Sequence, residues 1–268
     1  MFRKVMTMAA LGALCAAATP AHAASTTQPG ETAGVAAGAP LPPGLYFVNT
    51  LSWGERNDVD VVVEIPVLAW STPWHFLGAR VQFLLATPYV ATDAVDGWYN
   101  VYGAAQLAWD LGEGWGVSYA VGGYTDSPSD AGVQSSSFNQ RFAVSYTADG
   151  WNLTANVIHG HQSEDIINDF LNVDLTATKK IRKWEVGLVG FGSTDLNGDD
   201  ATELSQFALG GLIGYDFGRF ILQGYVTRDL VEDNYGEKET RLWSRLILPL
   251  RHGHDEHVEP VVEHTPLK

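Results

Sequence analysis

Hydrophobic and polar residues alternate on both sides of a tight turn between residues 207 and 229. Before the turn, every second residue from Phe207 to Phe217 is either apolar or glycine. The same period continues after the turn, where Gln223 and Thr227 have the opposite parity. A period of two predicts a β-hairpin with one apolar face, and about ten residues is the length of a membrane-spanning strand. A soluble sandwich contains similar hairpins, so the interpretation depends on whether the chain repeats this unit.

The chain does repeat it, and the pattern predicts twelve strands. Apolar residues at helical spacing are not sustained between the glycines and prolines, so no helix is expected. The predicted strands are 44–52, 59–70, 77–88, 98–109, 115–124, 137–148, 151–159, 170–179, 183–193, 204–217, 220–229 and 239–250.

The connections between these strands alternate in length. Short turns lie at 110–114, 149–150, 180–182 and 218–219. Longer and mostly acidic connections lie at 89–97, 125–136, 160–169, 194–203 and 230–238. Bacterial outer-membrane barrels have short periplasmic turns and longer extracellular loops. The sequence therefore predicts an all-β fold, a transmembrane antiparallel up-and-down β-barrel of about twelve strands.

Aromatic residues support this prediction. The sequence has 9 Trp, 10 Tyr and 11 Phe, and many of them lie near the ends of predicted strands. Tryptophan and tyrosine favour the membrane interface because the ring is apolar while its N–H or O–H group reaches water. Aromatic residues also favour strands in general, so a secreted soluble all-β binding module is the alternative.

The N-terminal residues predict export. A basic pair, Arg3 and Lys4, precedes an apolar stretch and the cleavage pattern Ala21-His22-Ala23, which together are typical of a secretory signal peptide. Cys15, the only cysteine, lies inside that peptide, so the mature chain can form neither a disulfide nor a cysteine metal site. We expect a signal peptide at 1–23, a flexible Ala, Gly, Thr and Pro-rich leader at 24–43, the barrel at 44–250 and a periplasmic tail at 251–268.

Charge and hydropathy restrict the function classes. The formal net charge is -15, and loss of Arg3 and Lys4 with the signal peptide makes it -17. Nucleic-acid binding is not expected, because phosphate contacts need basic residues. After the signal peptide no apolar run reaches the ~20 residues of a transmembrane helix. The expected location is the outer membrane, and the expected partners are outer-membrane lipid, lipopolysaccharide and a small-molecule solute; the oligomeric state is left open.

Three short motifs resemble those of a known family. They lie at 42–46 (Pro-Pro-Gly-Leu-Tyr), 65–70 (Ile-Pro-Val-Leu-Ala-Trp) and 72–80 (Thr-Pro-Trp-His-Phe-Leu-Gly-Ala-Arg). The sequence resembles the outer-membrane transporter family associated with the phenol meta-degradation pathway. The resemblance implies a channel for passive passage of small organic molecules, aromatic ones included. It supplies no site residues. Neither a cofactor nor an enzymatic activity is expected.

Strand parity predicts a set of charged residues that line the channel. Opposite charges close together in a narrow pore can form an eyelet that orients solutes, whereas paired buried charges can instead plug and stabilise a small barrel. Both alternatives stay open. Closure of the barrel pairs the last strand with the first, which is expected to place the last two residues of the set within a strand or two of the first two. The predicted set is Asp60, Glu64, Arg80, Arg141, Asp174, Glu185, Arg241 and Arg245.

Two other kinds of site receive less support. His159, His161 and Ser163 lie close together in the sequence, but their spacing matches no hydrolase signature, so an outer-membrane barrel hydrolase is kept only as an alternative. The tail contains His252, His254 and His257, which are possible ligands for zinc or copper. A solvated tail is the preferred interpretation, because ordering a flexible segment opposes metal binding.

Overall fold

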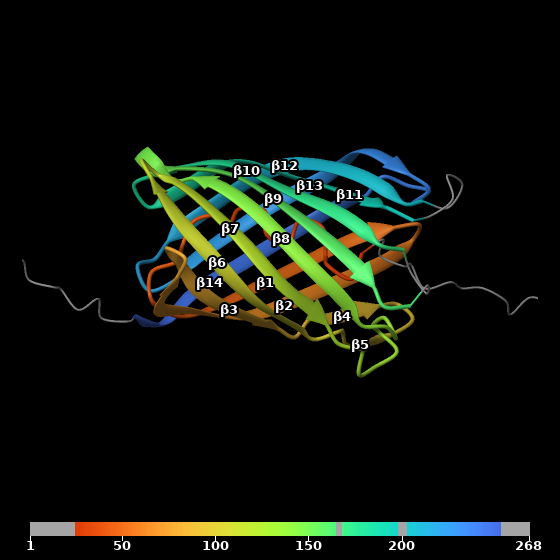
Figure 1. The fold of residues 1–268 in the computed structure, drawn as a ribbon. Helices are drawn as coiled ribbons and strands as arrows, with labels where there is room; N and C mark the ends of the chain where they lie inside the picture. The colour runs from red at the N-terminus through yellow and green to blue at the C-terminus, as the bar shows by residue number, and fades with distance from the viewer. Residues whose placement is uncertain (1–24, 165–167, 198–202, 253–268) are drawn as a thin grey trace, which may run out of the picture.

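The computed structural model describes residues 25–164, 168–197 and 203–252, and these residues form one closed antiparallel barrel. β1 pairs with β2 along one edge and with β14 along the other, which closes the sheet. Figure 1 shows the strands inclined to the barrel axis. The strands are β1 (Gly44–Arg56), β2 (Val59–Phe76), β3 (Ala79–Ala86), β4 (Tyr89–Thr92), β5 (Asp96–Trp98), β6 (Tyr102–Gly112), β7 (Trp115–Tyr124), β8 (Ser137–Tyr146), β9 (Trp151–Gln162), β10 (Phe170–Ile181), β11 (Trp184–Asp195), β12 (Ser205–Asp216), β13 (Ile221–Asp233) and β14 (Thr240–His252).

Twelve of these described strands form the barrel wall, which confirms the predicted fold class. The other two, β4 and β5, lie in a connection that the sequence analysis assigns to a loop. They have four and three residues, too few for a period of two to be recognised. A 3-10 turn, Ala148–Gly150, connects β8 to β9. Among the described residues, no helix has the length and apolar character needed to cross a membrane.

The outer surface of the barrel is apolar and the interior is mainly polar. In the hairpin of β12 and β13, Leu209 and Ile213 are exposed, whereas Gln223 and Thr227 are buried. A water-soluble barrel would place these two sets the other way round, because exposing so much apolar surface to water is unfavourable. The exterior therefore faces lipid, as in outer-membrane barrels.

Aromatic side chains mark the barrel ends. Trp184 and Tyr215 are in edge-to-face contact at 4.7 Å beside the turn that connects β12 to β13. At the turn itself, the rings of Phe217 and Phe220 stack at 4.7 Å. These residues form part of an aromatic girdle at the end with the short turns, which is the periplasmic end by the rule for outer-membrane barrels.

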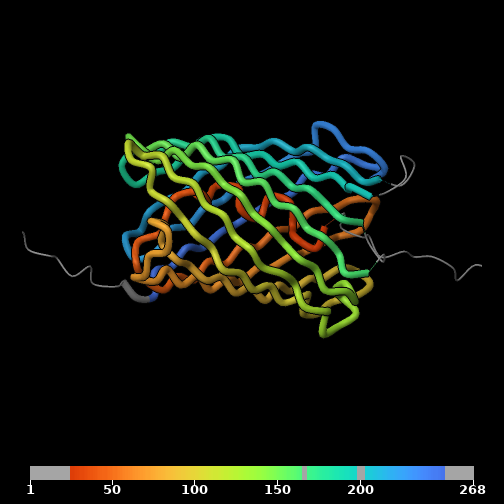
Figure 2. Tube along the Cα trace, viewed as in Figure 1, coloured from red at the N-terminus to blue at the C-terminus, as the bar shows by residue number. Residues whose placement is uncertain are grey.

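Residues 25–43 differ from the flexible leader that the sequence analysis expects. They lie inside the barrel, and Figure 2 shows their red and orange trace surrounded by the wall. Ala33 and Thr27 are both 0% exposed. Backbone hydrogen bonds between residues three apart, such as Ala33 N to Gly30 O at 3.1 Å, fold the segment into successive turns. Residue 24 lies outside the described residues.

Local chemistry explains why such a segment is ordered here. Gly30 and Gly34 have φ of 87° and 89°, a region that residues with a side chain rarely adopt. A Cβ on Gly30 would lie 2.6 Å from the ring of Phe191. Composition alone indicates disorder because the segment has little apolar surface to bury. The polar lumen instead supplies hydrogen-bond partners at fixed positions, which hold the segment in one conformation.

The predicted signal peptide at 1–23 lies outside the described residues. His254 and His257 also lie outside them, and only the backbone of His252 is described. The predicted metal site in the tail therefore stays a prediction. Within the described part of the chain, no group of three His, Cys, Asp or Glu residues could hold a metal ion.

Candidate functional site in the barrel lumen

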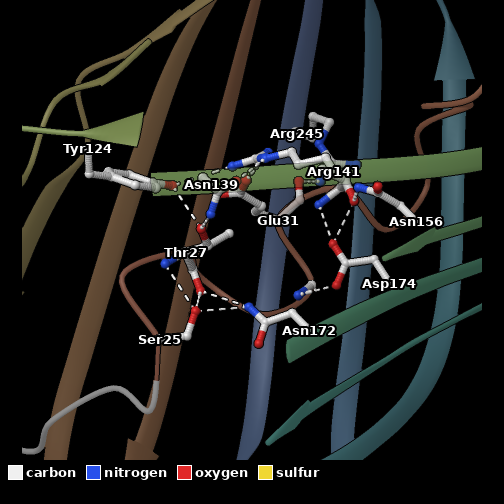
Figure 3. Close-up of polar contacts among 12 residues, drawn as sticks. Ser25, Thr27, Glu31, Tyr124, Asn139, Arg141, Asn156, Asn172, Asp174 and Arg245 are labelled. Atoms are coloured by element: carbon white, nitrogen blue, oxygen red, sulfur yellow. Dashed lines mark hydrogen bonds and ion pairs between the residues drawn. The ribbon is translucent and has the colours of Figure 1, made fainter. Parts of the chain in front are cut away.

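Asp174, on β10, attaches the N-terminal segment to the lumen wall. Its carboxylate accepts hydrogen bonds from Gly30 N at 2.8 Å, Thr32 N at 2.9 Å and Thr32 Oγ1 at 2.6 Å (Figure 3). Asn156, on the neighbouring strand β9, donates to the same Thr32 hydroxyl at 2.9 Å. Hydrogen bonds to an ionised carboxylate are stronger than those between neutral groups. Asp174 therefore fixes the middle of the segment to the wall.

Arg245, on β14, holds the opposite side of the segment. Its side chain is 0% exposed, and its guanidinium donates to the carbonyl oxygens of Glu31, at 2.6 Å, and Ala33. It also donates to Thr50 Oγ1 and to the Tyr225 hydroxyl, each at 2.9 Å. A buried guanidinium needs its donors paired, and here two of the partners belong to the N-terminal segment.

Glu31 forms an ion pair with the wall. Its carboxylate lies 2.7 Å from Arg141 Nη1, on β8. Arg141 also donates to Asn139 at 3.0 Å and lies 4.3 Å above the ring of Tyr102. Both side chains of the ion pair are about nine-tenths buried, at 10% exposure each. Burial of this kind makes the loss of either partner costly, because the remaining charge is left unpaired.

Further contacts attach the segment along the length of the lumen. Near the extracellular end, Asn172 donates to Ser25 Oγ at 2.9 Å and to Thr27 O at 3.1 Å. Toward the periplasmic end, Gly38 N donates to Ser145 Oγ at 2.9 Å and Ser118 Oγ donates to Ala37 O at 2.8 Å. The segment thus runs through the barrel from near its extracellular end to the start of β1.

A second group of charges lies in the extracellular half of the lumen. Arg56 Nη2 lies 2.5 Å from Asp229 and 3.4 Å from Glu239. Glu239 also pairs with Arg241 at 2.5 Å, and Arg241 donates to Ser52 at 3.1 Å. The cluster contains two arginines and two carboxylates, and each of the four has a partner of opposite charge within it. It lies at the wall formed by β1, β13 and β14.

One part of the lumen wall is apolar. Val63 and Ile65 on β2 are 6% and 5% exposed, and they belong to a cluster that includes Ala86, Tyr102 and Tyr124. The two tyrosine rings lie 4.8 Å apart. These residues form the apolar part of the wall on β2, β3, β6 and the end of β7. A second apolar cluster, which includes Val189, Phe191 and Trp243, lies on β11 to β14. Charged and amide side chains such as Arg141 and Asp174 lie on β8 to β10, between the two apolar regions.

The predicted channel-lining residues fall into two groups. Strand register and burial place six of them on the inner face: Arg80, Arg141, Asp174, Glu185, Arg241 and Arg245. Among these, Glu185 accepts a hydrogen bond from Gln223 at 2.9 Å, and Arg80 donates to Thr72 O at 3.1 Å.

Asp60 and Glu64 are on the outer face, which corrects the sequence-based assignment. Glu64 pairs across the sheet with Leu51, which is 42% exposed. Asp60 accepts a hydrogen bond from the exposed Trp53 Nε1 at 3.1 Å. The error has a physical cause: β2 carries apolar residues on both faces, so alternation cannot decide which face is inner. The pairing of Val63 and Ile65 with the inward residues of β1 decides it.

Barrel closure does place Arg241 and Arg245 within two strands of Asp60 and Glu64, as expected, but on the opposite face of the sheet. The actual partners are Glu239 for Arg241 and the N-terminal segment for Arg245. Sequence reasoning also missed Glu31, Arg56, Asp229 and Glu239. Only Glu31 gave a signal, since it is the one charged residue between positions 24 and 43.

The residues of the alternative hydrolase site have separate partners. His161 Nδ1 lies 2.8 Å from Asp169 at the extracellular end of the barrel. Ser163 contacts the hydroxyls of Ser135 and Ser136 at 3.1 and 3.0 Å. Nucleophilic catalysis needs a base within hydrogen-bond reach of the hydroxyl, and no such histidine contacts Ser163 among the described residues.

The closed sheet, lipid-facing exterior and polar lumen define the class of protein: an outer-membrane β-barrel of the channel type. The chain belongs to the family described as "Putative MetA-pathway of phenol degradation", whose model matches residues 26–246.

Solved structures show the same fold. The COG4313 outer membrane channel from Pseudomonas putida F1 matches with a TM-score of 0.58 and 16% identity, covering 79% of this chain and 97% of that one. The beta domain of the Bordetella autotransporter BrkA matches with a TM-score of 0.51 and 11% identity, covering 78% and 100%. Comparison with curated protein sequences gives no match.

Proposed function

We propose that this protein is a channel for passive passage of small organic molecules, aromatic ones included, across the outer membrane. The observation that carries the proposal is a lumen that combines aromatic clusters with charged and amide side chains. A ring can contact an aromatic cluster such as that of Tyr102 and Tyr124 while a polar substituent reaches the neighbouring Arg141 and Asn139. Ligand sites that combine an apolar surface with a few polar groups suit such molecules. We propose no catalytic role.

The N-terminal segment restricts this path. The inward side chains that contact it are almost completely buried; Arg245 and Asn172, for example, are each 0% exposed. A solute that follows the lumen on this side must therefore displace part of the segment. The segment is held mainly by hydrogen bonds to wall residues and by the ion pair between Glu31 and Arg141. In this proposal, Arg141, Asp174 and Arg245 act by retaining the segment in the lumen.

The lumen charges have two alternative roles, stabilising a plug or forming an eyelet that orients solutes, and different residues serve each role in this proposal. Arg141, Asp174 and Arg245 stabilise a plug, because each binds the N-terminal segment. Arg241 instead binds Glu239 and Ser52. It remains available, with Arg56, to set the field that a passing ion experiences.

Solute flux into liposomes tests the function. The mature chain and a variant without residues 25–39 are reconstituted, and the entry of phenol, benzoate and a neutral sugar is followed by liposome swelling. We expect the deletion variant to admit each small solute faster than the full chain, and phenol to enter faster than a sugar of greater size. Heat-modifiable migration on gels controls for folding. If neither protein admits any solute faster than empty liposomes, the channel function is wrong.

Conductance in planar bilayers supplies the second measurement. Asp174→Asn removes the negative charge that binds Gly30 and Thr32 and leaves a similar volume, so it is expected to increase open-channel conductance or the frequency of openings. Asp216→Asn, at the periplasmic end of β12, is the matched control because this carboxylate contacts Lys180 and not the segment. Equal effects of the two substitutions would contradict the role of Asp174 in retaining the segment.

A further inference from the structure

The barrel wall is interrupted near its extracellular end. The ladder between β3 and β6 ends where Ala86 pairs with Tyr102. Above this point β4 continues the pairing with β2, and β5 pairs with β4. No described strand pairs with the other edge of β5. We call the region between β5 and the ends of β6 and β7 the wall seam.

A loop closes the seam in place of a strand. Ser129 Oγ donates to Trp98 O at 2.7 Å. The buried Asn100 amide donates to Thr125 O and Val133 O, each at 2.7 Å, and Asn100 Oδ1 accepts from Val133 N at 2.8 Å. The loop 125–136 is therefore held over the seam by side chain to backbone hydrogen bonds. This arrangement leaves space between side chains that a continuous ladder would fill.

That space is an apolar cavity. Its volume is about 270 Å³, and it is lined by Thr87, Trp98, Tyr99, Val101 and Pro128. The lining contains two aromatic rings, a valine and a proline, and it contains no charged residue. Trp98 is 54% exposed, and its ring packs edge-on against Tyr89 at 5.4 Å. The cavity is thus open toward the outer surface beside an aromatic pair.

The cavity also adjoins the apolar part of the lumen. Thr87 follows Ala86 directly in the chain, and Val101 precedes Tyr102. Ala86 and Tyr102 belong to the buried cluster with Val63, Ile65 and Tyr124. The pocket therefore lies at the same height in the wall as this cluster.

Volume and lining select the ligand. An enclosed apolar cavity of about 150 Å³ accommodates benzene; this pocket is open on its outer side, and its volume of about 270 Å³ leaves room for one ring with small substituents. A charged solute would lose its hydration there without finding an opposite charge. We propose that the seam cavity is a binding site for a small uncharged single-ring aromatic molecule. The proposal deepens the proposed function, because it rests on aromatic solutes being the ones that reach this barrel.

Fluorine NMR tests this site directly. 4-Fluorotoluene and 4-fluorobenzoate are titrated into the detergent-solubilised mature protein, and line broadening gives the bound fraction. Val101→Phe fills the cavity with a ring, and Pro128→Phe does so from the loop, where a change is less harmful to folding. Leu188→Phe is the matched control, since Leu188 is 56% exposed on the lipid-facing surface and adds the same ring elsewhere.

We expect 4-fluorotoluene to bind wild type and Leu188→Phe equally, and to bind the two cavity variants at least about tenfold more weakly, which is 1.4 kcal/mol. 4-Fluorobenzoate is expected to bind much more weakly to all four proteins. Equal binding of 4-fluorotoluene to folded Val101→Phe and Pro128→Phe and to wild type would overturn the site, as would preferential binding of the benzoate. Because the readout is binding, loss of solute flux with binding retained would contradict the channel function and leave the site standing.

Discussion

The carboxylate of Glu31 lies 2.7 Å from the guanidinium of Arg141, across the interface between the N-terminal segment and strand β8. Glu31 is the one charged residue between positions 24 and 43, and the ion pair connects it to the barrel wall. Its partners on the wall include the ring of Tyr102, which belongs to the apolar part of the lumen. The pair therefore lies where the polar and apolar parts of the lumen meet.

Glu31→Gln is expected to loosen the segment. The substitution leaves Arg141 buried without its counter-charge, and loss of one partner of a buried pair costs about 3–5 kcal/mol. The sequence has no cysteine after Cys15, and Ala33 is 0% exposed. A single Ala33→Cys substitution in the chain from residue 24 onward therefore reports on the segment. We expect faster modification of this cysteine by a water-soluble maleimide in the Glu31→Gln background. Glu113→Gln, at an exposed periplasmic turn, is the control. Unchanged labelling would contradict the role of the pair.

Arg245→Ala and Arg241→Ala are expected to have different effects, although the two residues lie on the same face of β14. Arg245→Ala removes donors to Glu31 O and Ala33 O, so it should increase both conductance and labelling at position 33. Arg241→Ala leaves the segment in place and makes the cluster of Asp229 and Glu239 more negative, so cation selectivity should rise. Conductance and reversal potentials in planar bilayers measure both effects. The same change in selectivity from both variants, with no change in labelling, would contradict this division.

Asp60→Asn and Glu64→Gln are expected to leave ion selectivity unchanged. Both carboxylates lie on the outer face of β2, so neither contributes directly to the surface along which solutes move. Reversal potentials in a salt gradient provide the measurement, with Arg241→Ala as the positive comparison. A shift as large as that of Arg241→Ala would show that these residues face the lumen after all.

Asp169 makes the attachment of an extracellular connection dependent on pH. Partial burial favours a higher pKa, but hydrogen bonds from His161, the Gln162 N–H and Asn197 outweigh burial and lower the pKa of Asp169. A carboxylate whose pKa is lower in the folded state adds stability above its unfolded pKa, about 3.9, and loses it as the pH falls through the folded value. Stabilisation by this group should thus be complete at neutral pH and lost in acid below about pH 4.

Two backbone amides contact Asp169: Gln162 N donates to its carboxylate and Leu196 N donates to its backbone carbonyl oxygen. Hydrogen exchange of these amides at matched temperatures measures the loss of stability in acid. Their protection, corrected for the intrinsic pH dependence of exchange, should fall in acid in the wild type. Asp169→Asn should show the weaker protection at every pH. A pH profile of the variant identical to that of the wild type would assign the acid sensitivity to another group.

The alternation of residues along the chain is sufficient to place the twelve strands of the barrel wall and to assign the class of fold. In β12 and β13, a period of two with apolar residues on one face is sufficient to predict strands. Such a face must contact either lipid or a protein core, and the alternation of short turns with long loops favours lipid. The aromatic residues at the strand ends, such as Phe217 and Phe220, follow the same local rule. Arg141, Asp174 and Arg245 were assigned to the inner face by parity, because their strands have clearly different faces.

How the lumen is filled depends on contacts between residues far apart in the sequence. Residues 25–43 have too little apolar surface to predict order, and their order comes from wall groups, such as Asp174 and Arg245, that are 140 or more positions away. The orientation of β2 was undetermined as well, because both of its faces are apolar and the pairing with β1 sets the inner one. Closure of the barrel brings these distant groups together, and local periodicity carries no information about contacts of that range.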